Sequence, residues 1–491
     1  MAKAIPASDA TVSAGAAVSR DVTVSAEAIE ALNVAMRGNV ATDEATLRAY
    51  SIDRSGVEPD GVPVAVVWPE DTEQVQAAVR WAAEHGVSVV PRGAGTGLAG
   101  SATAGSGSLV VCLERMNKVL EVSADDRLAV VQPGILNDEL NALLHKDGLW
   151  WPPDPASKAI STVGGNIAAN AGGFLCAKYG VTQQWVLGLT VVLADGRVVS
   201  MGRRTVKGVS GYDITSMLIG SEGTLGIIVE CVLKVRPLQS AERATLVAVC
   251  DSAVDAAAAA SAVTAANLQP AMMELLDEVT SAAVVGHLVA TDETFVDPTE
   301  GKPASLLLVQ TDGLGAAAEL AQVHDAVVGF ARHVRVAQSD AETEALIGMR
   351  RAVFPAIERM GGSVLVEDIA VPRTRMAEAF TRMREIERKY GVTLPSAAHA
   401  GDGNMHPVFV FEPVAGETGL DAVPAHVWKA ADEVFSVALE MGGTLTGEHG
   451  VGLLKKRFLP EELGEDQTGL QQQLRKVFDP EGIMNPGKVL D

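Results

Sequence analysis

A glycine-rich segment that directly follows a short apolar strand is the feature that most constrains the fold. Within residues 91–98, Pro-Arg-Gly-Ala-Gly-Thr-Gly-Leu, and on to Ser101, glycine recurs at nearly every second position, and Gly95 to Gly100 match the pattern GxGxxG. In a Rossmann fold this pattern opens a helix whose N-terminus binds a pyrophosphate. Here the next residues, 101–107, read Ser-Ala-Thr-Ala-Gly-Ser-Gly and predict no helix. The context therefore excludes the Rossmann interpretation.

The segment before the glycines predicts a strand, a helix and a second strand. Residues 63–68 are apolar and β-rich, and Asp71 with Gln74 forms a capping-box pattern at the start of a helix. Gly86 predicts the end of that helix, and residues 87–90 form the next strand. A glycine loop between two strands can still bind phosphates through successive backbone N–H groups, and Arg92 adds a positive charge. The alternative is a hairpin or linker that only needs glycine.

The composition favours a multidomain globular protein. A chain of 491 residues divides into two or three domains, and its net charge of −23 argues against nucleic acid or anionic lipid as a general partner. Four scattered cysteines without a CxxC pair fit a reducing compartment and give no ligand set for an iron–sulfur cluster. No run of about 18 apolar residues predicts a membrane span. We expect a cytoplasmic protein, with peripheral membrane attachment left open.

The order of patterns predicts an α+β chain in four parts. Further strands are expected at residues 109–113, 128–131, 187–193 and 225–233, and the composition shifts near Arg236-Pro237. A helix at 252–266 and strands at 305–310 and 363–371 then indicate a second α+β domain. We predict a tail and helical segment at 1–57, with a loose tail up to about residue 28. A cofactor domain at 58–237, a substrate (cap) domain at 238–440 and a C-terminal segment at 441–491 follow.

Two short glycine-rich segments concentrate histidine and acidic residues. Residues 399–406 read His-Ala-Gly-Asp-Gly-Asn-Met-His, and residues 446–452 contain Glu448 and His449. The glycines around Asp402 disfavour a helix, so a strand–loop–strand would have to bring the two rings together. Two His and one Glu with an open position are suited to a metal that acts as a Lewis acid. The alternative is that these are loop histidines with ordinary hydrogen bonds.

From about Val62 to its C-terminus the chain resembles a known family of flavoproteins. The 91–98 loop resembles the pyrophosphate loop of the vanillyl-alcohol-oxidase (PCMH) type of FAD domain, and later loops at 151–157, 162–166, 170–173, 179–180 and 219–226 match the same family in order. The closest resemblance is to FAD-linked oxidases that include the glycolate oxidase flavin subunit, D-lactate dehydrogenases and D-2-hydroxyglutarate dehydrogenase. It implies a two-subdomain FAD-binding domain and a cap domain with an antiparallel sheet, with the C-terminal segment returning to the FAD domain.

The resemblance also implies residue roles. The positions expected to bind FAD are Pro91, Arg92, Gly93, Ala94, Gly95, Thr96, Gly97, Leu98, Pro133, Gly134, Asp154, Pro155, Ser157, Thr162, Gly164, Gly165, Asn166, Asn170, Gly172, Gly173, Tyr179, Glu222, Gly223, Gly226, Ile228 and Asn485. The pyrophosphate loop contains no His or Cys for covalent attachment, so we predict non-covalent FAD.

The same resemblance assigns the catalytic cluster. It implies that His399, His406 and Glu448 bind a divalent metal and that His449 is the general base, with Asn404 in support. Zn, Mn and Fe all accept such ligands. Arg350 matches the position that binds the substrate carboxylate, and Arg351 is expected to be a solvated neighbour.

The resemblance predicts metal-assisted oxidation of a small D-2-hydroxy acid, D-lactate or glycolate, with hydride transfer to the flavin. Apolar Phe354 and Val366 disfavour a substrate with a distal carboxylate, so D-2-hydroxyglutarate is the alternative. A flavin subunit of a larger glycolate oxidase is a second alternative. The sequence leaves open the electron acceptor (a quinone, a cytochrome, an electron-transfer flavoprotein or an iron–sulfur subunit) and the oligomeric state, a homodimer included.

Overall fold

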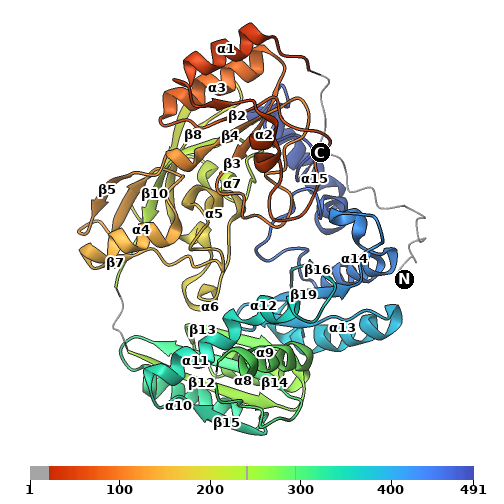
Figure 1. The fold of residues 1–491 in the computed structure, drawn as a ribbon. Coiled ribbons are helices and arrows are strands. Elements are labelled where there is room, and N and C mark those ends of the chain that lie inside the picture. Colours follow the sequence, from red (N-terminus) through yellow and green to blue (C-terminus); the bar gives the residue numbers. More distant parts are fainter. Residues whose placement is uncertain (1–21, 239–241, 293–294, 491) are drawn as a thin grey trace.

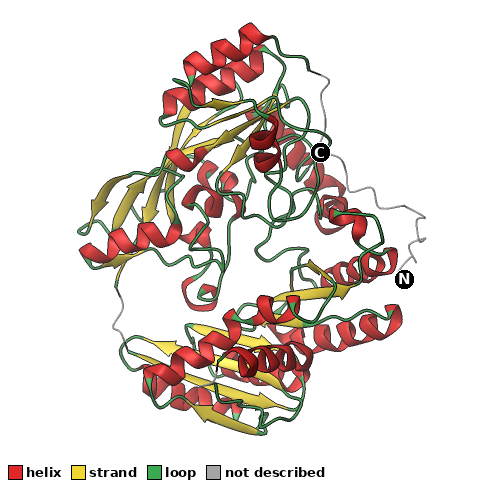
Figure 2. Cartoon of the chain, viewed as in Figure 1, coloured by secondary structure: helices red, strands yellow, loops and turns green. Residues whose placement is uncertain are grey.

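A computed structural model describes residues 22–238, 242–292 and 295–490; the predicted N-terminal tail lies largely outside these ranges. Two smaller sheets form the upper part of the molecule and one large sheet forms the lower part (Figure 1). Helices pack against the sheets, and both faces of the large sheet are covered by them (Figure 2). The α+β class and the antiparallel cap sheet predicted from the sequence are confirmed.

The first sheet has the order β1-β2-β4-β3 and carries the glycine-rich loop at the end of β3. Its strands are β1 (Val40–Ala41), β2 (Ala65–Val67), β3 (Ser88–Arg92) and β4 (Ser108–Cys112). β4 is parallel to both β2 and β3, and α3 (Thr72–Glu84) connects these two. Asp71 caps α3 by accepting a hydrogen bond from the backbone N–H of Gln74, as the sequence predicts. Segment 93–107 contains no helix before β4, which confirms that the Rossmann interpretation fails.

Two more helices precede β2. They are α1 (Ala26–Ala35) and α2 (Glu44–Ser51), and α1 packs on α3 through Leu32 and Met36. Since β1 pairs with β2, the segment before residue 58 is built into the first sheet. The C-terminus also returns there, because the backbone N–H of Asn485 donates to the carbonyl of Val89. The domain boundaries at 57/58, 237/238 and 440/441 stay a prediction.

The second sheet is antiparallel and has the order β5-β6-β10-β8-β9. Its strands are β5 (Val119–Ser123), β6 (Leu128–Val131), β8 (Val186–Val192), β9 (Val198–Gly202) and β10 (Ile227–Lys234). The helices α4 (Asn137–Leu144) and α5 (Val163–Ala169) pack on it through a core that includes Trp151, Ile167 and Leu189. Short elements complete this part of the chain: β7 (Leu149–Trp150), β11 (Arg236–Pro237), α6 (Cys176–Tyr179) and α7 (Ile214–Leu218).

The large sheet belongs to the second half of the chain and runs β15-β12-β14-β13-β18-β19-β16, with β17 also paired to β19. Its strands are β12 (Arg243–Cys250), β13 (Met272–Leu276), β14 (Ser305–Asp312), β15 (His333–Val336), β16 (Ser363–Val366), β17 (Ile369–Ala370), β18 (Ser396–His399) and β19 (Asn404–Phe411). One face is covered by α8 (Ala253–Ala265), α10 (Ala316–Val327), α13 (Met376–Tyr390) and α14 (Ala425–Glu440). The other face packs on α9 (Glu278–Thr291), α11 (Asp340–Arg351) and α12 (Val353–Glu358).

One predicted strand is interrupted. The sequence predicts a continuous strand over residues 363–371, but the structure breaks it between β16 and β17 at Glu367 and Asp368. Both carboxylates are buried, and Asp368 accepts hydrogen bonds from the chain that follows α14. The backbone N–H of Glu367 still donates to the carbonyl of Pro407 in β19, whereas the side chain of Asp368 is held by tertiary hydrogen bonds. The last helix, α15 (Leu459–Phe478), then leads back to the first sheet.

Candidate active site

A cavity of about 1520 Å³ lies where the FAD-type loops meet the large sheet. The whole 91–98 loop lines it, together with the helix α5 N-terminus, the 221–226 turn and residues of α11, α12, β16 and β19. The predicted site residues on its wall are Pro91, Arg92, Gly93, Ala94, Gly95, Thr96, Gly97, Leu98, Pro133, Pro155, Ser157, Thr162, Gly164, Gly165, Asn166, Gly172, Glu222, Gly223, Gly226, Ile228, Arg350, His406, Glu448 and His449.

The glycines of this wall are packed against other loops. A Cβ on Gly93 would lie 2.3 Å from Oγ1 of Thr162, which caps α5. A Cβ on Gly164 would lie 2.4 Å from Cβ of Pro133 and 3.0 Å from its carbonyl oxygen. Side chains are therefore excluded where the loops approach one another. The resulting wall of exposed backbone fits a planar ring and a diphosphate, and the cavity exceeds the usual 300–1,000 Å³ of a single ligand pocket.

Six predicted cofactor residues do not line the cavity. They support its loops: Asn485, for example, donates to the carbonyls of Ser101 and of the wall residue Glu222, whose carboxylate accepts from the backbone N–H groups of Val451 and Gly452. The Tyr179 hydroxyl donates to Asp312 at 2.6 Å. The residues off the wall are Gly134, Asp154, Asn170, Gly173, Tyr179 and Asn485.

Each of the other four supporting residues has a definite local role. Asp154 accepts from the backbone N–H of Leu175, and burial raises the pKa of Asp154 to about 7. Asn170 ends α5 with a φ of 50° and accepts from Gln183. Gly134 and Gly173 make room for neighbouring backbone, since a Cβ would lie 2.0 Å and 2.3 Å from a carbonyl oxygen. These residues shape the cavity from behind its wall.

The arginine of the glycine-rich loop is already engaged. Arg92 is 8% exposed, donates to the carbonyl of Ile52 at 3.0 Å and lies over the ring of Tyr50. A Cβ on Gly95 would lie 2.0 Å from the Arg92 guanidinium, so glycine is required there. Arg92 therefore fixes the loop against the segment before residue 58.

The metal-type cluster forms through strand pairing. In the antiparallel pair β18–β19, Ala397 lies opposite His406. His399 lies two residues after Ala397, so it is the diagonal neighbour of His406 on the same face of the sheet. The two rings are 5.0 Å apart, and Glu448 approaches both, at 3.7 Å from Nε2 of His399 and 3.2 Å from Nε2 of His406. The candidate ligand atoms of all three residues lie within 4.8 Å of one another. The predicted meeting of the two imidazoles across a strand–loop–strand is confirmed.

The charges of this cluster suit a cation. Burial lowers the pKa of His406 to about 3, which leaves its lone pair free. Burial opposes ionisation of Glu448, but its hydrogen bond with His399 and the nearby histidines lower its pKa to about 2. For His399, burial opposes protonation, yet Glu274 and Glu448 raise its pKa well above the usual range. A divalent cation would take the place of that proton, since metal ligation requires the neutral imidazole.

Glu274 is a site residue that the sequence analysis missed. It lies opposite His399 in the β13–β18 pair, accepts from Nδ1 of His399 at 2.7 Å and from Nε of Arg350 at 2.6 Å, and is fully buried. A carboxylate behind a ligating histidine fixes its tautomer and orientation. The available signal was a lone acidic residue inside the apolar strand β13, because a buried charge needs partners.

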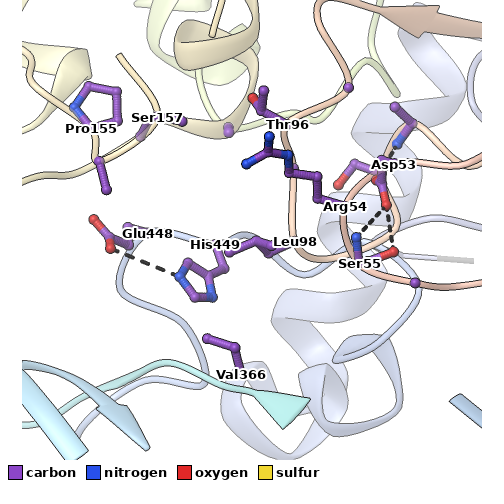
Figure 3. A pocket seen from close by; sticks show the side chains of 18 of the residues that line it. Asp53, Arg54, Ser55, Thr96, Leu98, Pro155, Ser157, Val366, Glu448 and His449 are labelled. Carbon is purple, nitrogen blue, oxygen red and sulfur yellow. Dashed lines mark hydrogen bonds and ion pairs between the residues drawn. The ribbon is translucent and has the colours of Figure 1, made fainter. Parts of the chain in front are cut away.

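Asp368 and Lys455 form a second missed pair. Lys455 is 2% exposed and contacts the Asp368 carboxylate, which also accepts from the backbone N–H groups of Gly447 at 2.6 Å and Glu448 at 2.8 Å. Nδ1 of His449 lies 3.5 Å from the same carboxylate, and its Nε2 lies 4.0 Å from Glu448 (Figure 3). Burial opposes ionisation of Asp368, but Lys455 and His449 hold its pKa well below its usual range. Asp368 therefore positions both Glu448 and His449.

Comparison with known proteins decides the family. The model described as "FAD linked oxidases, C-terminal domain" matches residues 239–489, and the model described as "FAD binding domain" matches residues 63–202. The chain belongs to the FAD-linked oxidase family. It is a flavoprotein oxidoreductase, as the sequence analysis expects. Glycolate oxidase subunit GlcD of Bacillus subtilis is 36% identical over 444 residues, covering 90% of this chain and 91% of the relative.

Other FAD-linked oxidases and solved structures agree. The D-lactate dehydrogenase of Archaeoglobus fulgidus is 33% identical, covering 87% of this chain and 91% of the relative. 4-Ethylphenol oxidase from Gulosibacter chungangensis shares the fold with a TM-score of 0.73 at 20% identity, covering 95% of this chain and 98% of that one. p-Cresol methylhydroxylase has the same TM-score at 18% identity, covering 95% and 97%. These structures confirm the PCMH-type fold. In the described residues no helix is long and apolar enough to cross a membrane.

Proposed function

We propose that this FAD-linked oxidase converts a small D-2-hydroxy acid, D-lactate or glycolate, to the 2-oxo acid. The carrying observation is the cluster of His399, His406 and Glu448 with His449 beside it, at one end of the cavity that the FAD-type loops line. Relatives named glycolate oxidase subunit and D-lactate dehydrogenase support the choice of substrate.

His399, His406 and Glu448 are proposed to hold a divalent metal, with Zn, Mn or Fe as candidates. When bound, such an ion supplies Lewis-acid chemistry that lowers the pKa of the substrate hydroxyl. The three residues fit this role because their candidate ligand atoms, two imidazole nitrogens and a carboxylate oxygen, lie within 4.8 Å of one another. His406 and Glu448 also line the cavity, so an ion held by them would be within reach of a substrate bound there.

His449 is proposed as the general base. The carboxylate of Asp368 faces Nδ1, so the opposite nitrogen, Nε2, is directed toward Glu448 and the cavity. A base that takes the hydroxyl proton must lie beside the group that binds the substrate oxygen, and the rings of His406 and His449 are 5.4 Å apart. The proton removed from the substrate is therefore held at Nε2 of His449, where Asp368 stabilises the resulting charge.

Arg350 is proposed to orient the substrate carboxylate. The Nε of Arg350 donates to Glu274. A guanidinium has five N–H donors in all, so the terminal nitrogens remain for the substrate carboxylate. The bound FAD supplies the redox chemistry by accepting the Cα hydride. Val366 lines the same cavity and offers no polar group to a second carboxylate. This favours a small hydroxy acid over D-2-hydroxyglutarate.

The decisive experiment is anaerobic reduction of the bound flavin by a panel of D- and L-2-hydroxy acids. We expect D-lactate or glycolate to bleach the flavin absorbance and L-lactate to leave it unchanged. His449→Ala should abolish bleaching, whereas the exposed His426→Ala should not. Absence of bleaching by every acid in the panel, with FAD fully bound, would refute the proposal.

A second candidate is a flavin subunit that passes electrons to a partner, favoured because the Bacillus relative is named a subunit. Two results together would distinguish this candidate. Hydroxy acids would reduce the flavin of the isolated chain, but no quinone, cytochrome, electron-transfer flavoprotein or oxygen would reoxidise it at a catalytic rate. Light scattering of the purified chain would give its oligomeric state. Fractionation of the cells that produce it would give its compartment.

A further inference from the structure

Four arginines line the large cavity, and three of them have partners in the protein. Arg92 donates to the carbonyl of Ile52, Arg350 pairs with Glu274, and exposed Arg351 pairs with Glu344. Within residues 22–238, 242–292 and 295–490, no hydrogen bond or ion pair is found for Arg54. A cation that lines a ligand cavity without a protein partner points to an anionic group on the ligand.

Arg54 is mounted on a turn that is fixed to the glycine-rich loop. Asp53, on its N-terminal side, is 7% exposed and accepts from the backbone N–H of Ser55 at 3.0 Å and of Ala102 at 3.2 Å. On the other side of the loop, Arg92 binds the carbonyl of Ile52. The backbone of Arg54 is thus tied to both ends of the glycine-rich loop.

The direction of the side chain follows from this mounting. Figure 3 shows the Arg54 side chain extending toward Thr96 of the loop, while Glu448 and His449 lie on another side of the cavity. A Cβ on Gly97 would lie 3.7 Å from Oδ2 of Asp53, which confirms that the turn and the loop are in close approach. The guanidinium is therefore placed over the backbone that forms the anion-binding concavity.

We propose that Arg54 binds the diphosphate of FAD and closes the phosphate site opposite the glycine-rich loop. Backbone N–H groups give that loop partial positive charge but no formal charge, and the one arginine within it is used structurally. A guanidinium binds phosphate oxygens bidentately and keeps its charge at every relevant pH. Residue 54 precedes the segment 63–202 that the FAD-domain model matches, so that model does not include this contact.

The test measures cofactor binding to the deflavinated full-length protein, by quenching of flavin fluorescence. Arg54→Ala should weaken FAD binding by about tenfold or more, the effect of losing a charge-assisted hydrogen bond. Riboflavin, which lacks phosphate, should bind wild type and variant equally. The affinity of wild type for FAD should also fall more steeply with salt than that of the variant. Arg54→Lys should retain part of the FAD affinity.

Arg359→Ala is the matched control, because this arginine is exposed and outside the cavity wall. It should leave FAD affinity unchanged. Equal loss of FAD and riboflavin affinity in Arg54→Ala would assign a structural role and overturn the proposal. So would an unchanged FAD affinity with a raised KM for the hydroxy acid, which would place Arg54 at the substrate. The FAD, riboflavin and salt measurements require no turnover, so the binding test fails independently of the proposed reaction.

Discussion

Replacing Asp368 by Asn should destabilise the protein and disable the site together. The wild-type carboxylate is fully buried, contacts buried Lys455 and accepts from the backbone N–H groups of Gly447 and Glu448. An amide of the same size keeps the volume but removes the charge, leaving Lys455 with Glu367 at 3.5 Å as its remaining carboxylate. Breaking a buried ion pair by removing one partner costs about 3–5 kcal/mol, and we expect a loss in the free energy of unfolding within that range.

The assay is chemical denaturation at pH 7, with the exposed-pair variant Glu378→Gln as control. Glu378 pairs with Arg375 at the surface, where an ion pair contributes only about 0–1 kcal/mol. The double variant Asp368→Asn/Lys455→Met should be less destabilised than Asp368→Asn alone, because it also removes the buried ammonium that Asp368→Asn leaves with only Glu367 at 3.5 Å. Asp368→Asn within about 1 kcal/mol of wild type would refute the role of the ion pair.

The pH dependence of stability has a definite sign. The pKa of Asp368 is lowered in the folded protein, so its contribution is fully present above the unfolded value of about 3.9 and is lost as the pH falls below it. Above about pH 5 Asp368 stays ionised in both states, so its own titration adds no pH dependence to the difference in stability between wild type and Asp368→Asn. Below about pH 4 the two stabilities should converge. A difference that grows toward acid pH would contradict the assignment.

Three further variants test the remaining parts of the site. Glu448→Gln removes a charged group from the proposed metal site and should lower bound metal, measured by elemental analysis, and flavin reduction by about tenfold or more. Arg350→Met leaves buried Glu274 without its cation and should raise the KM for the hydroxy acid by about tenfold or more, with lower stability. Gly164→Ala would place a Cβ 2.4 Å from Pro133 and should cost about 1–3 kcal/mol of stability, together with FAD affinity.

The controls for these variants use the same chemistry elsewhere. Glu440→Gln removes an exposed carboxylate and should leave the metal content unchanged. Arg359→Met should leave KM unchanged, since Arg359 is exposed and outside the cavity. Gly286→Ala adds a Cβ with no atom within 4 Å inside α9 and should be neutral or stabilising by up to about 1 kcal/mol. Equal effects in test and control variants would contradict the site assignments.

Local sequence patterns correctly predicted the structural features that depend on residues close together in the chain. The cap of α3 at Asp71, the turn at Gly86 and the pair of strands that carry His399 and His406 are all set within about fifteen residues of sequence. Glu274 is different, because it reaches His399 only through the β13–β18 register, 125 residues away. No periodicity carries that information, and the only local sign was a charge inside an apolar strand.

The two arginines show the same limit in the cofactor site. Arg92 lies in the glycine-rich loop, so proximity in sequence predicts phosphate binding, yet its guanidinium is used to hold Ile52. Arg54 lies outside every recognisable motif, and only the folding of its turn against Ala102 and Gly97 brings it to the cavity. The Arg92 guanidinium packs against the backbone of its own loop, since a Cβ on Gly95 would lie 2.0 Å from it. The compensating cation must then come from a separate segment, and in the described chain Arg54 is the lining arginine left to supply it.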